Sequence, residues 1–199
     1  MLLDVDESQL LLVDYQERLM PSIHEREAVL LNAMRLGRMA RLLGVPAWGT
    51  EENPARLGPN PAELRALCGK TLEKMHFSAC ADGLAELLRA PARQAQGGNA
   101  RSLPKHLQKA PPAERNTIVM AGCETHVCFL QTALDLLDEE FEVWVVTDAC
   151  GSRTERNRDA AFDRLAGAGA ELVTTEMVAF EWLRTADHPL FKDVLSLIK

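Results

Sequence analysis

The chain has 199 residues, of which 47% are hydrophobic and 26% are charged, and its formal net charge is −7. This length and composition are typical of one globular domain with a sizeable core, so we expect a single domain spanning 1–199. The excess of acidic residues argues against nucleic acid and anionic membranes as partners. We see neither an apolar run long enough to span a bilayer nor the basic start of a signal peptide, so we expect a soluble, cytoplasmic protein.

The cysteines do not suggest a disulfide framework or a zinc site. Their number is odd and their spacing irregular, and no C-x-x-C pair is present. The five are Cys68, Cys80, Cys123, Cys128 and Cys150.

In the first half of the chain, short apolar runs alternate with one long helical period. The pattern predicts, in order, a strand at 9–14, a helix at 25–43, a strand at 45–50 and a weaker strand at 71–75. Gly44 ends the helix, as a C-terminal glycine does. Asp14 closes the first strand, and Lys74 lies in the third.

The second half continues the alternation. It predicts a strand at 117–121, a helix at 125–138, a strand at 143–147, a helix at 155–166, a strand at 170–174 and two further helical segments. Apolar strands that alternate with helices predict a parallel sheet in a doubly wound, three-layer α/β/α sandwich. Ligands bind such sheets beyond the carboxyl ends of the strands, so residues that follow each strand are the site candidates.

One stretch, at about 89–116, does not fit this alternation. It is rich in Ala, Pro, Gly, Gln and basic residues. We expect an irregular surface insertion with one short helix near 101–109. A lid or an oligomer contact is the alternative.

Cys128 is the candidate nucleophile. Thr125 suits the N-cap of the predicted helix, which places Cys128 in the first turn, where free N–H groups and the helix dipole favour a thiolate. On a helical wheel Cys128 lies away from the apolar side, in the arc of Gln131, Thr132 and Asp135. Taken alone, a cysteine is still more often a core residue than a nucleophile.

Asp14 and Lys74 each have an ordinary and a functional interpretation. Asp14 either caps the next turn or, with its pKa raised by partial burial, serves as a base. Lys74 is either a solvated surface group or a cation beside a thiolate and a carboxylate. No histidine has a spacing that pairs it with Cys128; the five are His24, His76, His106, His126 and His188.

Four separated segments, at 13–16, 74–78, 122–128 and 145–153, resemble isochorismatase-like cysteine hydrolases, in their uncharacterised, metal-free branch. The resemblance covers nearly the whole chain except about 89–116. It implies a six-stranded parallel sheet ordered 3-2-1-4-5-6, with the ends of strands one and four side by side.

The resemblance also implies roles for particular residues. The catalytic triad would be Asp14, Lys74 and Cys128. A cis peptide would join Cys123 to Glu124, and the N–H groups of Glu124 and Cys128 would form an oxyanion hole.

Two departures narrow the expected chemistry. The stretch 50–59 has no histidine, whereas metal-binding nicotinamidases of this family have an Asp-x-His there, so we expect no metal and no other cofactor. Cys128 argues against vinyl-ether cleavage, since isochorismatases proper lack the cysteine. The expected reaction is hydrolysis of a small amide or related C–N bond through a thioester; the alternatives are a non-catalytic binding or scaffold protein and a redox sensor.

The substrate is not identified by the sequence. Five residues that follow the relevant strands are candidate pocket residues: Tyr15, Gln16, Glu51, Phe77 and Thr125. A homo-oligomer is a possible assembly.

Overall fold

A computed structural model describes residues 1–89 and 115–199. The expected short helix near 101–109 lies outside the described residues. No helix in these two ranges is both long enough and apolar enough to cross a bilayer.

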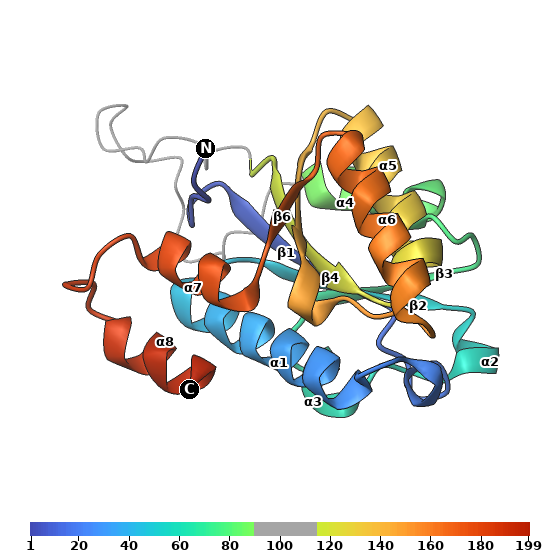
Figure 1. Cartoon of the computed structure of the whole chain (residues 1–199), viewed down its shortest axis with the longest axis horizontal. Coiled ribbons are helices and arrows are strands. Elements are labelled where there is room, and N and C mark those ends of the chain that lie inside the picture. The colour runs from blue at the N-terminus through green and yellow to red at the C-terminus, as the bar shows by residue number, and fades with distance from the viewer. Residues whose placement is uncertain (90–114) are drawn as a thin grey trace, which may run out of the picture.

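The six predicted strands form one parallel sheet in the order β3-β2-β1-β4-β5-β6 (Figure 1). They are β1 Ser8–Val13, β2 Ala47–Glu52, β3 Lys70–Lys74, β4 Thr117–Gly122, β5 Glu142–Val146 and β6 Glu171–Val173. The expected fold and strand order are confirmed. The order reverses between β1 and β4, which is where this class of sheet binds ligands.

Helices cover both faces of the sheet. Their bounds are α1 Arg26–Leu43, α2 Pro54–Leu57, α3 Ala62–Arg65, α4 Leu84–Arg89, α5 Leu130–Asp138, α6 Glu155–Gly167, α7 Thr175–Leu183 and α8 Phe191–Ile198. In Figure 1, α1, α7 and α8 lie on one face, and α4, α5 and α6 lie on the other. Gly44 ends α1 in the left-handed conformation, as expected.

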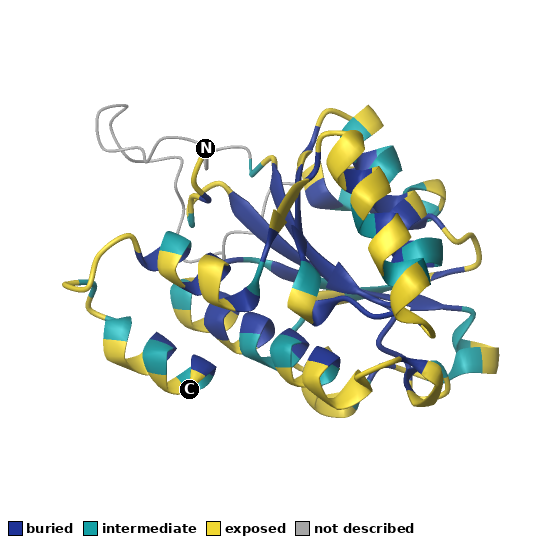
Figure 2. Ribbon diagram, viewed as in Figure 1, coloured by how far each residue is buried: buried dark blue, intermediate teal, exposed yellow. Residues whose placement is uncertain are grey.

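Alternation along each central strand divides the core into two apolar clusters. In β1, Leu10 and Leu12 face the α1 layer, whereas Leu11 and Val13 face the α5 layer. All six residues of β1 and of β4 are buried. Figure 2 shows this directly, with dark blue strands between helices whose outer sides are yellow.

The second strand is shifted from its predicted position. It spans Ala47–Glu52 rather than 45–50, because the residue after the Gly44 cap, Val45, still donates its N–H to Ala40 O of α1 at 2.8 Å. Two acids, Glu51 and Glu52, therefore end a buried strand. The sequence pattern alone did not predict this, since acids are rarely buried without partners.

The segment after β4 also differs from the prediction. Thr125 is not an N-cap: Glu124 holds that position without a side-chain cap, and residues Thr125–Phe129 form a π-helical turn before α5. The Phe129 N–H donates to Glu124 O at 3.3 Å, five residues back. The Thr125 N–H instead donates to Gly151 O at 2.9 Å, which links this turn to the loop after β5.

Gly122 allows β1 and β4 to approach closely at their carboxyl ends. A Cβ at this position would lie 2.5 Å from both Cβ and O of Val13. Val13 pairs with Gly122 in the register, so this contact fixes the backbone on which Asp14 follows.

We therefore predict that Gly122→Ala destabilises the fold by about 1–3 kcal/mol, because the added methyl group must push two central strands apart. Urea unfolding followed by circular dichroism measures this. Gly167→Ala is the matched control, since a Cβ there has nothing within 4 Å. An unchanged unfolding midpoint for Gly122→Ala would contradict the close packing.

Candidate active site

The carboxyl ends of three strands bring acidic and basic side chains together. Glu52 pairs directly with Lys74 in the β2–β3 register, and Val13 pairs with Thr50 of β2. Asp14 follows Val13, and its N–H donates to Thr50 O at 3.3 Å. Parallel pairing thus places Asp14, Glu52 and Lys74 at one edge of the sheet.

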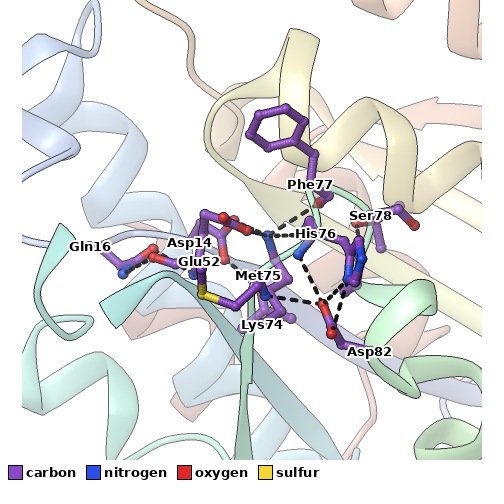
Figure 3. A network of polar contacts seen from close by, with 12 residues as sticks. Asp14, Gln16, Glu52, Lys74, Met75, His76, Phe77, Ser78 and Asp82 are labelled. Atoms are coloured by element: carbon purple, nitrogen blue, oxygen red, sulfur yellow. Dashed lines mark hydrogen bonds and ion pairs between the residues drawn. The ribbon is translucent and has the colours of Figure 1, made fainter. Parts of the chain in front are cut away.

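The Lys74 ammonium is the centre of this cluster, and its side chain is fully buried. Nζ lies 2.8 Å from Asp14 Oδ2 and 2.8 Å from Glu52 Oε2. It also donates to the carbonyls of His76 at 3.3 Å and Phe77 at 3.2 Å (Figure 3). Two carboxylates and two carbonyls replace the water that the ammonium loses on burial. Desolvation lowers the pKa of the ammonium, but the charge of Asp14 and the hydrogen bonds to Asp14 and Glu52 are among the effects that raise it overall.

Asp14 is fully buried and is held on both oxygens. Oδ1 accepts the Thr50 hydroxyl at 2.6 Å, and Oδ2 contacts Lys74. Its backbone has a φ of 51°, the left-handed region that aspartate tolerates better than most residues. The chain therefore turns sharply at the end of β1, and the carboxylate faces the α5 side of the sheet.

Cys128 reaches the same point from the π-helical turn. Its sulfur and one carboxylate oxygen each of Asp14 and Glu52 all lie within 4.8 Å of one another. Gln131 of the wheel arc predicted for Cys128 is exposed, whereas Thr132 is buried and Asp135 is partly buried. This inner part of the arc faces the segment after β3. It packs on the 3-10 turn Ala79–Asp82, where Thr132 Oγ1 accepts the Ala79 N–H at 3.0 Å and Asp135 accepts the Ser78 hydroxyl.

The expectation of a resting thiolate is wrong. Burial raises the pKa of the Cys128 thiol to about 12, and the Asp14 carboxylate contributes to the rise, whereas Lys74 lowers it by less. Cys128 is only 6% exposed, so desolvation outweighs the helix terminus. The resting site therefore holds a thiol beside a carboxylate.

The Cys123–Glu124 peptide bond is cis, as the resemblance implied. Within residues 1–89 and 115–199, the Glu124 N–H has no acceptor. The Glu124 carbonyl accepts from Val127 at 3.0 Å and from Phe129, and not from Cys128. The Glu124 carboxylate is turned away and fixed by Arg153, with two hydrogen bonds of 2.8 and 2.7 Å that lower its pKa.

Two of the candidate pocket residues, Tyr15 and Gln16, make hydrogen bonds to the backbone around the cluster. Tyr15 is buried in the cluster on the α1 side, where its hydroxyl donates to Ala149 O at 2.5 Å. Gln16 donates to Glu52 O at 2.9 Å and accepts the Glu52 N–H at 2.8 Å. Gln16 thus clamps the backbone at the end of β2.

The other three candidate pocket residues, Glu51, Phe77 and Thr125, have different surroundings. Glu51 points to the opposite face, where Oε1 accepts the Asn60 N–H at 2.8 Å and lies 3.5 Å from Arg65 Nε. The Phe77 ring is half exposed and points away from the polar network (Figure 3). Thr125 is fully buried, and its hydroxyl has no partner in the described part of the chain. Their pocket roles stay predictions.

The sequence reasoning missed Glu52 and named its neighbour instead. The available signal was strand alternation: Glu52 shares a face with Thr50, whose hydroxyl contacts Asp14. Glu51 has the other parity, so its side chain could not join this cluster.

The cluster does not fit a metal ion. Asp14, Glu52 and Cys128 form the one potential ligand group among the described residues. The Lys74 ammonium already contacts both carboxylates, so a cation would have to displace a buried positive charge. The absence of a metal cofactor stays a prediction.

Comparison with known proteins gives concordant matches. The family model of the isochorismatase domain matches residues 8–177. Isochorismatase domain-containing protein 2 of Bos taurus is 37% identical over 192 residues, covering 96% of this chain and 83% of that protein. The Rattus norvegicus protein of the same name is 34% identical over 194 residues, covering 98% of this chain and 82% of that protein.

Solved structures extend the likeness over the full chain. A structure described as MAR1 ribonuclease from Caenorhabditis elegans has a TM-score of 0.83 and 29% identity, and it covers 100% of this chain and 92% of that one. The ycaC gene product of Escherichia coli, described as an octameric hydrolase of unknown specificity, has a TM-score of 0.81 and 25% identity, with coverage of 100% and 95%.

The raised thiol pKa predicts how Cys128 reacts with iodoacetamide. Its alkylation rate should rise about tenfold per pH unit from pH 7 to pH 11 without a plateau, because only the thiolate reacts and its fraction grows until the pKa is reached. Asp14→Asn removes a charge that raises this pKa, so alkylation at a fixed pH becomes faster. Peptide mass mapping against pH measures both rates.

Asp148→Asn is the matched control for that variant, since Asp148 also follows a strand but contacts Thr175 instead. A wild-type plateau below pH 8, or slower alkylation in Asp14→Asn, would show that the thiol is already ionised at rest.

Proposed function

We propose that this chain, which belongs to the isochorismatase domain family, is a cysteine hydrolase that cleaves a small amide or related C–N bond through a thioester at Cys128. The observation that carries the proposal is the buried Lys74 ammonium, which holds the Asp14 carboxylate beside the Cys128 thiol. A base and a nucleophile at this distance are the minimal set for acyl transfer.

In the first half-reaction Asp14 takes the thiol proton and the sulfur attacks the substrate carbonyl carbon. The raised thiol pKa favours a transfer coupled to attack, because a free thiolate is costly in this buried position. The C–N bond then breaks, and the proton on Asp14 passes to the leaving nitrogen. A thioester and a free amine or ammonia result.

The negative charge on the carbonyl oxygen requires donors during this step. The Glu124 and Cys128 N–H groups are the proposed oxyanion hole, and the lack of an acceptor for the Glu124 N–H in the described ranges supports this assignment. Arg153 keeps the Glu124 carboxylate away from the developing charge.

In the second half-reaction a water molecule gives a proton to Asp14 and attacks the thioester. The C–S bond breaks, and the proton on Asp14 returns to sulfur, which regenerates the thiol. Lys74 Nζ, 2.8 Å from Asp14 Oδ2, keeps the carboxyl group oriented toward the sulfur in both half-reactions.

The alternatives fit the site less well. A redox sensor reacts through a thiolate, which the raised pKa disfavours. A scaffold gains nothing from a buried ion-pair cluster next to a cysteine, because such clusters contribute little to stability. A phosphodiester, such as the ribonuclease description of the C. elegans protein suggests, would add negative charge beside Asp14 and Glu52.

The wider setting of the protein is part of the same proposal. We take the chain to be one domain that acts on a small molecule in the cytoplasm, with neither nucleic acid nor membrane as partner. A homo-oligomer agrees with the octameric description of the E. coli relative.

Replacing Cys128 with Ala should lower hydrolysis of small primary amides by about 10⁴-fold or more, since no other group supplies the nucleophile. Ammonia release across an amide panel measures this, and circular dichroism checks the fold. Cys80→Ala is the matched control, because Cys80 belongs to the same side of the core but contacts Thr132 rather than the carboxylates. Turnover retained in Cys128→Ala would exclude the thioester mechanism.

A further inference from the structure

One oxygen of Glu52 is left without a donor. Oε2 contacts Lys74 at 2.8 Å, whereas Oε1 accepts no hydrogen bond from any described residue. Glu52 is 8% exposed overall, and Oε1 is not among the fully buried polar atoms that lack a partner in the described residues, so a ligand can reach this oxygen. A ligand that supplies a hydrogen-bond donor there gains a charge-assisted hydrogen bond.

Glu52 is also held in place and directed at the nucleophile. Gln16 fixes its backbone N–H and carbonyl, and Lys74 fixes one end of its carboxylate. A carboxylate oxygen of Glu52 lies within 4.8 Å of Cys128 Sγ. A group bonded to that sulfur through one or two atoms would therefore lie within hydrogen-bonding reach of Glu52.

Charge in the cluster points to the kind of group that fits. Two carboxylates surround one ammonium, and the thiol beside them is protonated at rest. The site thus has an excess of negative charge before any ligand binds. Anionic substrates are disfavoured there, and hydrogen-bond donors are favoured.

We propose that Glu52 Oε1 accepts a hydrogen bond from an N–H of the substrate next to the scissile carbonyl. The substrate class is then neutral primary amides, ureas and related molecules with an N–H at that position and no carboxylate beside it. This inference rests on the proposed function, because it assumes that the reacting carbonyl lies at Cys128. The competing account is that Glu52 only positions Lys74.

Two neutral alkylating reagents separate these accounts. Iodoacetamide carries an N–H beside its carbonyl, and 2-iodo-N,N-dimethylacetamide does not. Both react with the same thiolate, so a change in thiol pKa or in the position of Lys74 alters both rates equally. A hydrogen bond to the amide nitrogen alters their ratio, and variants of Glu52 with a side chain of similar volume separate it from steric exclusion of the two methyl groups.

We expect the wild-type protein to label Cys128 with iodoacetamide in preference to the dimethyl reagent by about tenfold more than free N-acetylcysteine does, as one charge-assisted hydrogen bond allows. Glu52→Met, which keeps the length but has no acceptor, should remove most of this excess preference. Glu52→Gln, a neutral acceptor, should give an intermediate ratio and serves alone if Glu52→Met fails to fold.

Glu73→Gln is the matched control, since Glu73 is an exposed acid of β3 next to Lys74 and should leave the ratio unchanged. A ratio that neither Glu52 variant alters, even with both rates lowered, overturns the proposal and leaves Glu52 as a positioning residue. The labelling ratio can be measured without any turnover, so it tests the Glu52 contact alone. The proposed hydrolysis has its own test, and it fails if Cys128→Ala still releases ammonia.

Discussion

A buried lysine ammonium needs acceptors on several sides, and Lys74 finds them only where the ends of β1, β2 and β3 meet. Removing an ion from water costs several kcal/mol, so the two carboxylates and two carbonyls must be in place when the sheet forms. The order of the strands and their register provide this. Asp14 turns back after β1, Glu52 ends β2 opposite Lys74, and the segment after β3 folds its carbonyls over the ammonium.

The same interaction sets the state of the nucleophile. Lys74 already contacts the carboxylates of Asp14 and Glu52, so its positive charge lowers the pKa of the Cys128 thiol only in part. Burial is the largest effect on that pKa and raises it. The site therefore differs from one in which a cation stabilises a resting thiolate. In the proposed mechanism Asp14 and Cys128 exchange a proton only within the reaction, so the free thiol stays unreactive until a substrate arrives.

The sequence predicted those features that depend on local patterns. Apolar runs located the strands, Gly44 located the end of α1, and the resemblance at 122–128 implied the cis peptide bond between Cys123 and Glu124. Contacts between distant segments were not predictable in this way. Glu52 was missed because an acid in a buried strand is acceptable only with Lys74 opposite, and that pairing depends on the register. Tyr15 was assigned to the pocket by its position after β1, yet the left-handed turn at Asp14 interrupts the strand alternation, and Tyr15 is buried on the α1 side. The thiol pKa was predicted in the wrong direction because a helix-terminus argument omits desolvation.

The most direct test of the account is the mass of the protein during turnover. The protein is mixed with the primary amide that it hydrolyses fastest, quenched in acid within the first turnovers and analysed by intact and peptide mass spectrometry. The account predicts an acyl group on the peptide that contains Cys128, removable by hydroxylamine, and an acyl hydroxamate among the products when hydroxylamine is present during turnover. Turnover with no mass added at Cys128 and no hydroxamate formed would contradict it and would point to direct attack by water.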